Sequence, residues 1–148
     1  MKVVIGSDHG GYQLKEAVKE VLTELQVAFE DYGIFEEKSS DYPAIAKKVS
    51  MAVAQGEFDR GILLCGTGIG VSIMANKIKG IRAALCGDVF SAVMSREHND
   101  ANVLCLGGRV IGKGLAGMIV SVWLKTEFAQ GRHAKRIDMI TAFDNERE

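Results

Sequence analysis

Short apolar runs alternate with helical stripes along the whole chain. Runs rich in Val, Ile, Leu and Ala predict strands at 2–5, 61–65, 81–86 and 103–106, with a weaker one at 27–32. Apolar residues spaced three and four apart predict helices at 12–25, at 43–56, after residue 70, at 89–97 and at 115–128. The polar tail, about 131–148, is also predicted to be helical. Because apolar strands alternate with helices, we expect one three-layer α/β/α domain over residues 1–148, built on a parallel sheet.

One predicted helix lacks a polar side. The segment from Met118 to Leu124 is apolar nearly all round. A helix that only covers one face of a sheet shows polar residues to water on its other side. We therefore expect this helix to pack against something further. A second subunit is favoured, and the C-terminal tail folding back is the alternative.

The composition excludes several classes of partner. The 148 residues carry a net charge of −1, so no broad basic field attracts nucleic acid or a membrane surface. The N-terminal apolar run is too short for a signal peptide, and the stretch 114–124 is too short to span a bilayer. Three cysteines without C-x-x-C spacing predict neither disulfides nor a structural zinc site. We expect a reducing, cytoplasmic location.

The chemistry is expected at the carboxyl ends of the strands, where open parallel sheets bind ligands. The segments found there are SDHGG (7–11), CGTGIG (65–70), GD (87–88) and GGR (107–109). The glycines of the second segment let backbone N–H groups point at an anion beside a helix N-terminus. A tight turn that holds no ligand remains open.

Two nucleotide-binding patterns are nearly present. The turn 66–71 has Val71 where G-x-G-x-x-G needs its third glycine, so NAD binding is weakly supported. The segment 107–114 has Gly114 where a P-loop needs Ser or Thr, and we treat that match as chance.

Three residue types could carry proton transfer. Cys65 lies beside helix N–H groups that favour a thiolate, although a buried core cysteine is an equal reading, and it is the one we favour for Cys86 and Cys105. His9 and His98 both lie near strand ends, on segments that we expect to reach one pocket. They show no tight ligand spacing, so we expect no metal site.

Two arginines are spaced for an anion. If GRHAKR is helical, Arg132 and Arg136 lie one turn apart on one face, which suits a phosphate dianion. A solvated basic tail is the alternative.

Taken together, the motifs are those of a known family. GSDHGGYQLK, DYP (41–43), GILLCGTGIG with SIMANK, GIRAALC, SREHNDANVLCLGGRVIG and GRHAKRI resemble, in order and over nearly the whole chain, the type B ribose-5-phosphate isomerases. Galactose-6-phosphate and allose-6-phosphate isomerases belong to the same wider family. The resemblance implies a Rossmann-like domain with a five-stranded parallel sheet. It also implies a homodimer, in some members a tetramer, with active sites between subunits.

The implied activity is a metal-free and cofactor-free isomerisation of D-ribose 5-phosphate to D-ribulose 5-phosphate, in the pentose phosphate pathway. By resemblance, Cys65 is the base that moves a proton between C1 and C2, and His98 opens the sugar ring. The resemblance implies that the enediolate is stabilised by Gly66, Thr67, Gly68, Ile69 and Gly70. It also implies that the Thr67 side chain forms a hydrogen bond near the reacting atoms. Substrate contacts fall to Asp8, His9, Asn99 and Arg109, and phosphate binding to Arg132 and Arg136.

Three alternatives stay open. A six-carbon phosphosugar differs by only one carbon in pocket depth. A non-catalytic nucleotide- or phosphate-binding module would explain the glycine turn alone. A thiol redox protein would need a resolving cysteine near Cys65, and none is local in the sequence.

Overall fold

The computed structural model describes residues 1–147, and its centre is a five-stranded parallel sheet. The strands lie in the order β2-β1-β3-β5-β4. Their bounds are β1 Lys2–Ser7, β2 Ala28–Asp31, β3 Arg60–Cys65, β4 Ala83–Leu85 and β5 Val103–Gly107. The helices are α1 Tyr12–Glu24, α2 Tyr42–Ala54, α3 Ile69–Ala75, α4 Val89–Glu97, α5 Lys113–Lys125 and α6 Arg132–Glu146, with a short 3-10 helix at His9–Gly11.

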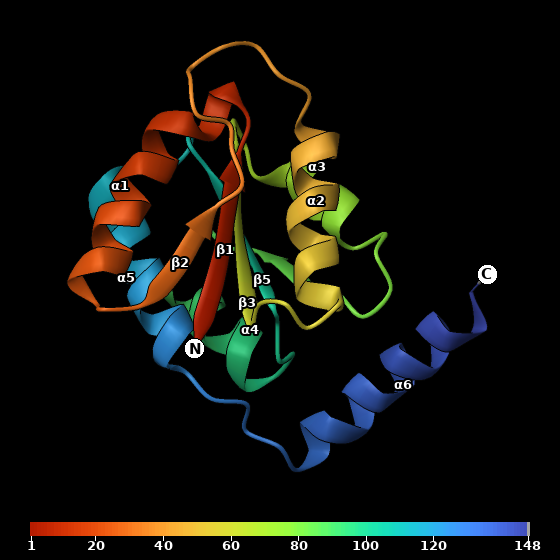
Figure 1. Cartoon of the computed structure of the whole chain (residues 1–148). Helices are drawn as coiled ribbons and strands as arrows, with labels where there is room; N and C mark the ends of the chain where they lie inside the picture. The colour runs from red at the N-terminus through yellow and green to blue at the C-terminus, as the bar shows by residue number, and fades with distance from the viewer. Residues whose placement is uncertain (148) are drawn as a thin grey trace.

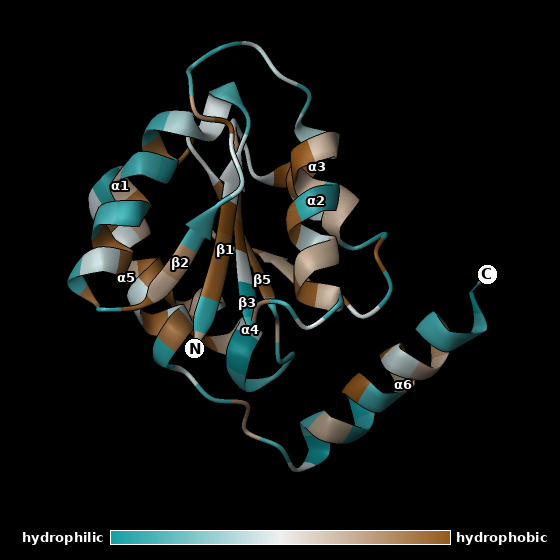
Figure 2. Ribbon diagram, viewed as in Figure 1, coloured by the Kyte–Doolittle hydropathy of each residue, from teal (hydrophilic) through white to brown (hydrophobic). Residues whose placement is uncertain are grey.

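Helices cover both faces of the sheet, as Figure 1 shows. Side chains alternate along each strand, so Val3 and Ile5 of β1 point into the core under α1, α4 and α5. Val4 points into the opposite core, under α2 and α3. The strands are accordingly the brown, apolar centre of Figure 2. The predicted three-layer fold with a five-stranded parallel sheet is confirmed.

Element boundaries differ from the prediction mainly at the sheet edge. The fourth strand was expected at 81–86 but covers only Ala83–Leu85. Ile81 is held in a turn, its N–H donating to the carbonyl of Ile78. β4 lies at the edge of the sheet and pairs only with β5, so one partner sets its length. The apolar periodicity alone does not show where such pairing stops.

The all-apolar helix α5 is covered within the chain. Its large side chains pack into the core shared with α1 and α4, and Trp123 is fully buried there. Met118 is exposed, and Leu115 lies at the border of exposure. The tail does not fold back over α5, because α6 projects away from the domain (Figure 1). Burial by α1 and α4 therefore accounts for most of the apolar surface of this helix, and the expected second subunit stays a prediction.

The helix that does lack a covering is α6. Met139, Ile140 and Phe143 are exposed along it, with 65%, 48% and 62% of their surface accessible. Near its end, Asp144 accepts a hydrogen bond from the Gly80 N–H at 2.9 Å, which ties α6 to the edge of the domain. The remaining apolar stripe faces no described part of the chain closely enough to be buried.

Candidate active site

Three glycine-containing turns meet at the carboxyl end of the sheet. They follow β1 (8–11), β3 (65–68) and β5 (107–109). The N–H of Gly108 donates to the carbonyl of Cys65 at 2.8 Å, and the N–H of Arg109 donates to that of Gly66 at 2.9 Å. A Cβ on Gly10 would lie 2.9 Å from the Gly66 nitrogen, and one on Gly108 would lie 2.5 Å from the Gly10 carbonyl oxygen. Glycine is needed because the backbones touch.

Cys65 ends β3 with its sulfur under the glycine turn. The residue is 4% exposed, and its Sγ accepts a hydrogen bond from the Gly68 N–H at 3.1 Å. An N–H that points at sulfur stabilises negative charge there. Thr67 lies beside it on the surface, and its Oγ1 accepts from the Ile69 N–H at 3.1 Å. The Thr67 hydroxyl can therefore still donate a hydrogen bond to a bound molecule.

The other two cysteines belong to the core. Cys86 is 2% exposed and Cys105 is fully buried. Burial raises the pKa of both thiols above its ordinary value. Their reading as core residues is confirmed. All three cysteines are free, so the structure contains no disulfide that would support a redox role.

The turn after β1 brings an acid and an imidazole to the same place. Asp8 is buried, and its carboxylate accepts from the Gly11 N–H at 3.1 Å, which holds the turn that carries His9. His9, Arg109, Gln13 and Glu37 line a hollow of about 230 Å³. The guanidinium of Arg109 lies over Gly66, where a Cβ would come 3.2 Å from Nη1. Asp8, His9 and Arg109 are thus gathered around the Cys65 turn.

Sequence reasoning missed several residues of this pocket. The segment 34–41 has no predicted helix or strand, yet Glu37 lines the hollow and the Ser40 N–H donates to His9 Nδ1 at 3.2 Å. Tyr42 packs its ring over Gly70, where a Cβ would lie 2.6 Å from Cζ. The loop has no periodicity that could reveal these contacts. The motif DYP, which contains Tyr42, is the only signal present in the sequence.

The remaining predicted residues lie at the amino ends of the strands, on the side of the sheet opposite the Cys65 turn. His98 follows the end of α4, and His98 and Asn99 precede the amino end of β5. The Asn99 carbonyl accepts from Arg82 Nε beside the start of β4. The five residues of β5, at about 3.3 Å each, separate this edge from the Cys65 turn by roughly 15 Å. Within a single chain His9 and His98 therefore do not reach one pocket, and their meeting in one site stays a prediction.

The reason is the direction of α4. This helix starts after the carboxyl end of β4 and runs back along the sheet, as the crossover between parallel strands requires. Its last residues therefore lie at the amino edge of the sheet. Any residue between a helix and the following strand shares this position, and His98 is such a residue.

A positive group surrounds His98. The ring of His133, in α6, stacks on the ring of His98 with centroids 4.2 Å apart and planes 14° apart. Arg132 and Arg136 lie on the same first turns of α6, and neither forms an ion pair within residues 1–147. Desolvation lowers the pKa of His133, and electrostatic repulsion from His98, Arg132 and Arg136 lowers it further. Such a group suits an anion.

Within residues 1–147, no three His, Cys, Asp or Glu side chains lie close enough together to hold a metal ion. None of the helices described there has the length and apolar character needed to cross a membrane.

Known proteins resemble this chain in both sequence and fold. Residues 3–140 match the family described as Ribose/Galactose Isomerase. Ribose-5-phosphate isomerase B of Escherichia coli is 48% identical over 146 residues, covering 99% of this chain and 98% of the relative. D-erythrulose-4-phosphate isomerase 2 of Mycolicibacterium smegmatis is 42% identical, with 97% of each chain covered. The solved structure of Clostridium thermocellum ribose-5-phosphate isomerase B is 52% identical, superposes with a TM-score of 0.96 and covers 99% of each chain. The chain therefore belongs to the ribose/galactose isomerase family.

Proposed function

We propose that this protein interconverts D-ribose 5-phosphate and D-ribulose 5-phosphate, with Cys65 as the proton-transfer base. The observation that carries the proposal is the hydrogen bond from the Gly68 N–H to Cys65 Sγ, inside a glycine turn at the carboxyl end of the sheet. That geometry places a candidate base and backbone donors within one turn. Family membership and the names of full-length relatives support the choice of reaction.

The chemical step moves one proton between neighbouring carbons of the open-chain sugar. The Cys65 thiolate takes the proton from C2 of the aldose, and the electron pair forms an enediolate. Backbone N–H groups of the turn 66–70 that do not already donate to Cys65 Sγ or Thr67 Oγ1 stabilise the developing oxygen charge, as an oxyanion hole does. The thiol then returns the proton to C1, while one hydroxyl proton passes from O2 to O1. Thr67 is placed to hold one of those oxygens.

Ring opening and phosphate binding need residues from the other edge of the sheet. His98 and Asn99 lie roughly 15 Å from the Cys65 turn in one chain. Arg132 and Arg136 lie on α6, whose His133 ring stacks on His98. We propose that a second copy brings them to the site, with its His98 moving a proton during ring opening. The exposed stripe Met139, Ile140 and Phe143 on α6 supports this pairing, because such a stripe is normally covered.

Phosphosugars with one carbon more or one carbon fewer are the alternative substrates. The relative from Mycolicibacterium smegmatis is named for a four-carbon phosphosugar. The six-carbon phosphosugars are the alternative that the sequence analysis left open. All share an aldose or ketose end and a phosphate, so the same residues could act on each. The three free cysteines fit the cytoplasmic location that we propose.

The test is a comparative assay of the purified protein on ribose 5-phosphate, allose 6-phosphate, galactose 6-phosphate and erythrulose 4-phosphate. We expect the highest kcat/KM on ribose 5-phosphate.

Cys65→Ala is expected to lose at least about a hundredfold in kcat, the usual contribution of a positioned base. Cys86→Ala, at the end of the next strand along the chain, is the matched control and should keep its turnover. Near-normal turnover in Cys65→Ala would reject the role of the thiol. Tight NAD or ATP binding without turnover of any phosphosugar would favour a non-catalytic module instead.

A further inference from the structure

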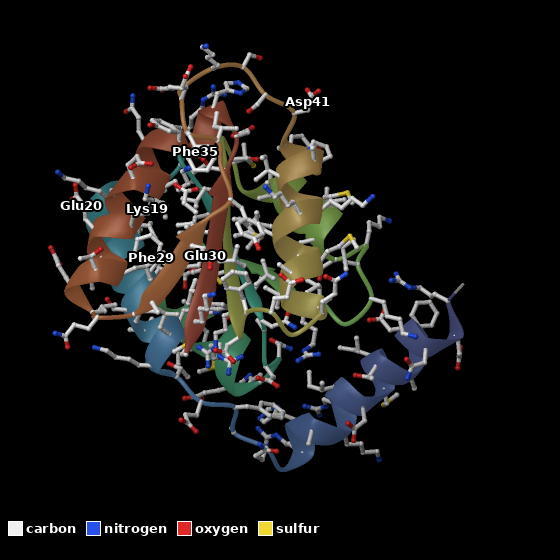
Figure 3. The ribbon with its side chains drawn as sticks, in the orientation of Figure 1. Lys19, Glu20, Phe29, Glu30, Phe35 and Asp41 are labelled. Atoms are coloured by element: carbon white, nitrogen blue, oxygen red, sulfur yellow. The ribbon has the colours of Figure 1, made fainter. Side chains whose placement is uncertain are left out.

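The 32–41 loop, which joins β2 to α2, lies against the carboxyl-end pocket. Figure 3 labels Phe35 and Asp41 on this loop, above the sheet. The Ser7 N–H, at the end of β1, donates to the Gly33 carbonyl at 2.7 Å, and the Ile34 N–H donates back to Ser7 at 2.9 Å. On the pocket side, Gln13 Nε2 lies 3.2 Å from both carboxylate oxygens of Glu37. The loop is thus joined to the elements that form the site.

A buried charge pair fixes the start of this loop. The side chain of Lys15 is fully buried, and its Nζ lies 2.9 Å from each carboxylate oxygen of Asp31. The same Nζ donates to the Ile34 carbonyl, and Asp31 accepts from the Gly33 N–H at 2.8 Å. A buried ion pair persists only when its geometry and hydrogen bonds are satisfied. This pair therefore holds the loop in one position relative to α1.

The far end of the loop contacts His9. The backbone N–H of Ser40 donates to His9 Nδ1 at 3.2 Å. A backbone N–H can only donate, so Nδ1 must be the nitrogen without hydrogen. A neutral imidazole has one donor and one acceptor, so its hydrogen lies on Nε2. The Ser40 hydroxyl is buried and makes no hydrogen bond within residues 1–147, which leaves the main-chain group as the link.

We infer that the 32–41 loop fixes His9 as the Nε2–H tautomer, so that His9 donates a hydrogen bond to an oxygen of the bound phosphosugar and does not act as a base. The identity of the bound molecule rests on the proposed function. Arg109 lines the same hollow and can only donate as well. Two donors on one hollow select oxygen lone pairs, as a hydroxyl or a phosphate offers. Ser40 is accordingly a positioning residue that acts through His9.

The tautomer can be measured without any substrate. The chain has three histidines, so protein labelled with ¹⁵N only at histidine gives a simple two-bond ¹H–¹⁵N spectrum. The His9 signals are assigned by their loss in His9→Gln. At a pH where the ring is neutral, we expect hydrogen on Nε2 and an Nδ1 resonance of an unprotonated, hydrogen-bonded nitrogen. Hydrogen on Nδ1, or shifts averaged between the two tautomers, would overturn the inference.

Two substitutions at His9 separate its nitrogens. The amide nitrogen of His9→Gln lies near the position of Nε2 and keeps a donor there, whereas the shorter His9→Asn reaches only the position of Nδ1. We expect His9→Gln to keep kcat/KM within about tenfold of the wild type, and His9→Asn to lose roughly a further 10- to 100-fold. Equal losses in the two variants, or a more active His9→Asn, would contradict the donor role.

Removing the backbone donor tests the loop directly. Ser40→Pro deletes the N–H, and we expect His9 shifts averaged between tautomers, a raised KM and a nearly unchanged melting temperature. Ser39→Pro removes a neighbouring N–H that makes no hydrogen bond within residues 1–147, and its His9 spectrum should match the wild type. Unchanged His9 signals in a folded Ser40→Pro protein would refute the loop's role. If that variant does not fold, the wild-type spectrum and the His9 pair decide the question.

The two proposals fail separately. A protein with the Nε2–H tautomer that isomerises none of the four sugar phosphates would reject the proposed function and leave the loop's effect on His9 standing. An active isomerase with hydrogen on His9 Nδ1 would reject only the inference about the loop.

Discussion

The backbone N–H of Gly68 donates to the sulfur of Cys65 at 3.1 Å, and a left-handed conformation at Gly68 (φ +79°) turns it there. A Cβ at Gly68 would lie 2.5 Å from Leu85 Cδ1 and 2.9 Å from the Leu106 carbonyl carbon. Both the conformation and the space therefore require glycine at this position. The donor and the base form one local unit between β3 and α3.

Gly68→Ala should damage this unit. A side chain in the left-handed region costs about 1–2 kcal/mol, and the clash displaces the N–H as well. We expect kcat to fall at least about tenfold, as for loss of one oxyanion-type donor. Gly56→Ala is the matched control, because Gly56 has a similar φ of +78° with nothing within 4 Å of its Cβ position. It should lower the melting temperature and leave kcat unchanged. Equal kcat in the two variants would show that the Gly68 N–H is dispensable.

Lys15→Met should be strongly destabilising. The side chain of Lys15 is fully buried, and its removal leaves the carboxylate of Asp31 with only part of its compensation. Breaking a buried pair costs about 3 kcal/mol or more in the free energy of unfolding. Lys19 is the control: it contacts the same carboxylate at 2.9 Å but is 26% exposed, so Lys19→Met should cost about 1 kcal/mol or less. Denaturant unfolding measures both values, and a Lys15→Met cost no larger than that of Lys19→Met would refute the ranking.

Asp31 should make the fold sensitive to acid. Burial raises the pKa of its carboxyl, but hydrogen bonds from Lys15, Lys19 and the Gly33 N–H outweigh burial and lower the pKa below its ordinary 3.8. A group with a lowered folded pKa stabilises the fold above its unfolded pKa, and loses that contribution as the pH falls through the folded value.

The melting temperature gap between the wild type and Asp31→Asn should therefore be constant near neutral pH and shrink below about pH 4. Thermal unfolding monitored by circular dichroism from pH 7 to pH 3 gives this comparison. A gap that stays constant over the whole range would mean that Asp31 does not carry the effect.

Arg136→Ala should weaken phosphate binding. The residue lies on α6 with no ion pair in the described chain, next to the ring of His133 and to Arg132. We expect KM for the phosphosugar to rise about tenfold or more, with kcat changed much less. Lys135→Ala removes a charge from the neighbouring position of the same helix and serves as the control. Equal KM values in the two variants would mean that Arg136 is a solvated surface residue and does not bind the phosphate.

The positions of the site residues differ in how well the sequence predicts them. The Cys65 turn was predictable because a buried strand followed at once by glycines is a local pattern. The position of His98 follows from the alternation of helices and strands, because a residue between a helix and the next strand lies at the amino ends of the strands. Which copy of the chain supplies His98 to a site does not follow from the sequence of one chain. The contact of Ser40 with His9 spans 31 positions and comes from a loop without periodicity, so no local signal predicts it.

We propose that Cys65 of one copy works with His98 and the arginines of another. Subunit mixing between Cys65→Ala and His98→Ala is the sharpest test of this shared site. Each variant alone is inactive, but a mixed dimer contains one site with both residues intact. Random pairing at equal amounts should restore about a quarter of the wild-type activity. Mixtures that stay as inactive as the separate variants, although mixed dimers are shown to form, would contradict a site shared between two copies.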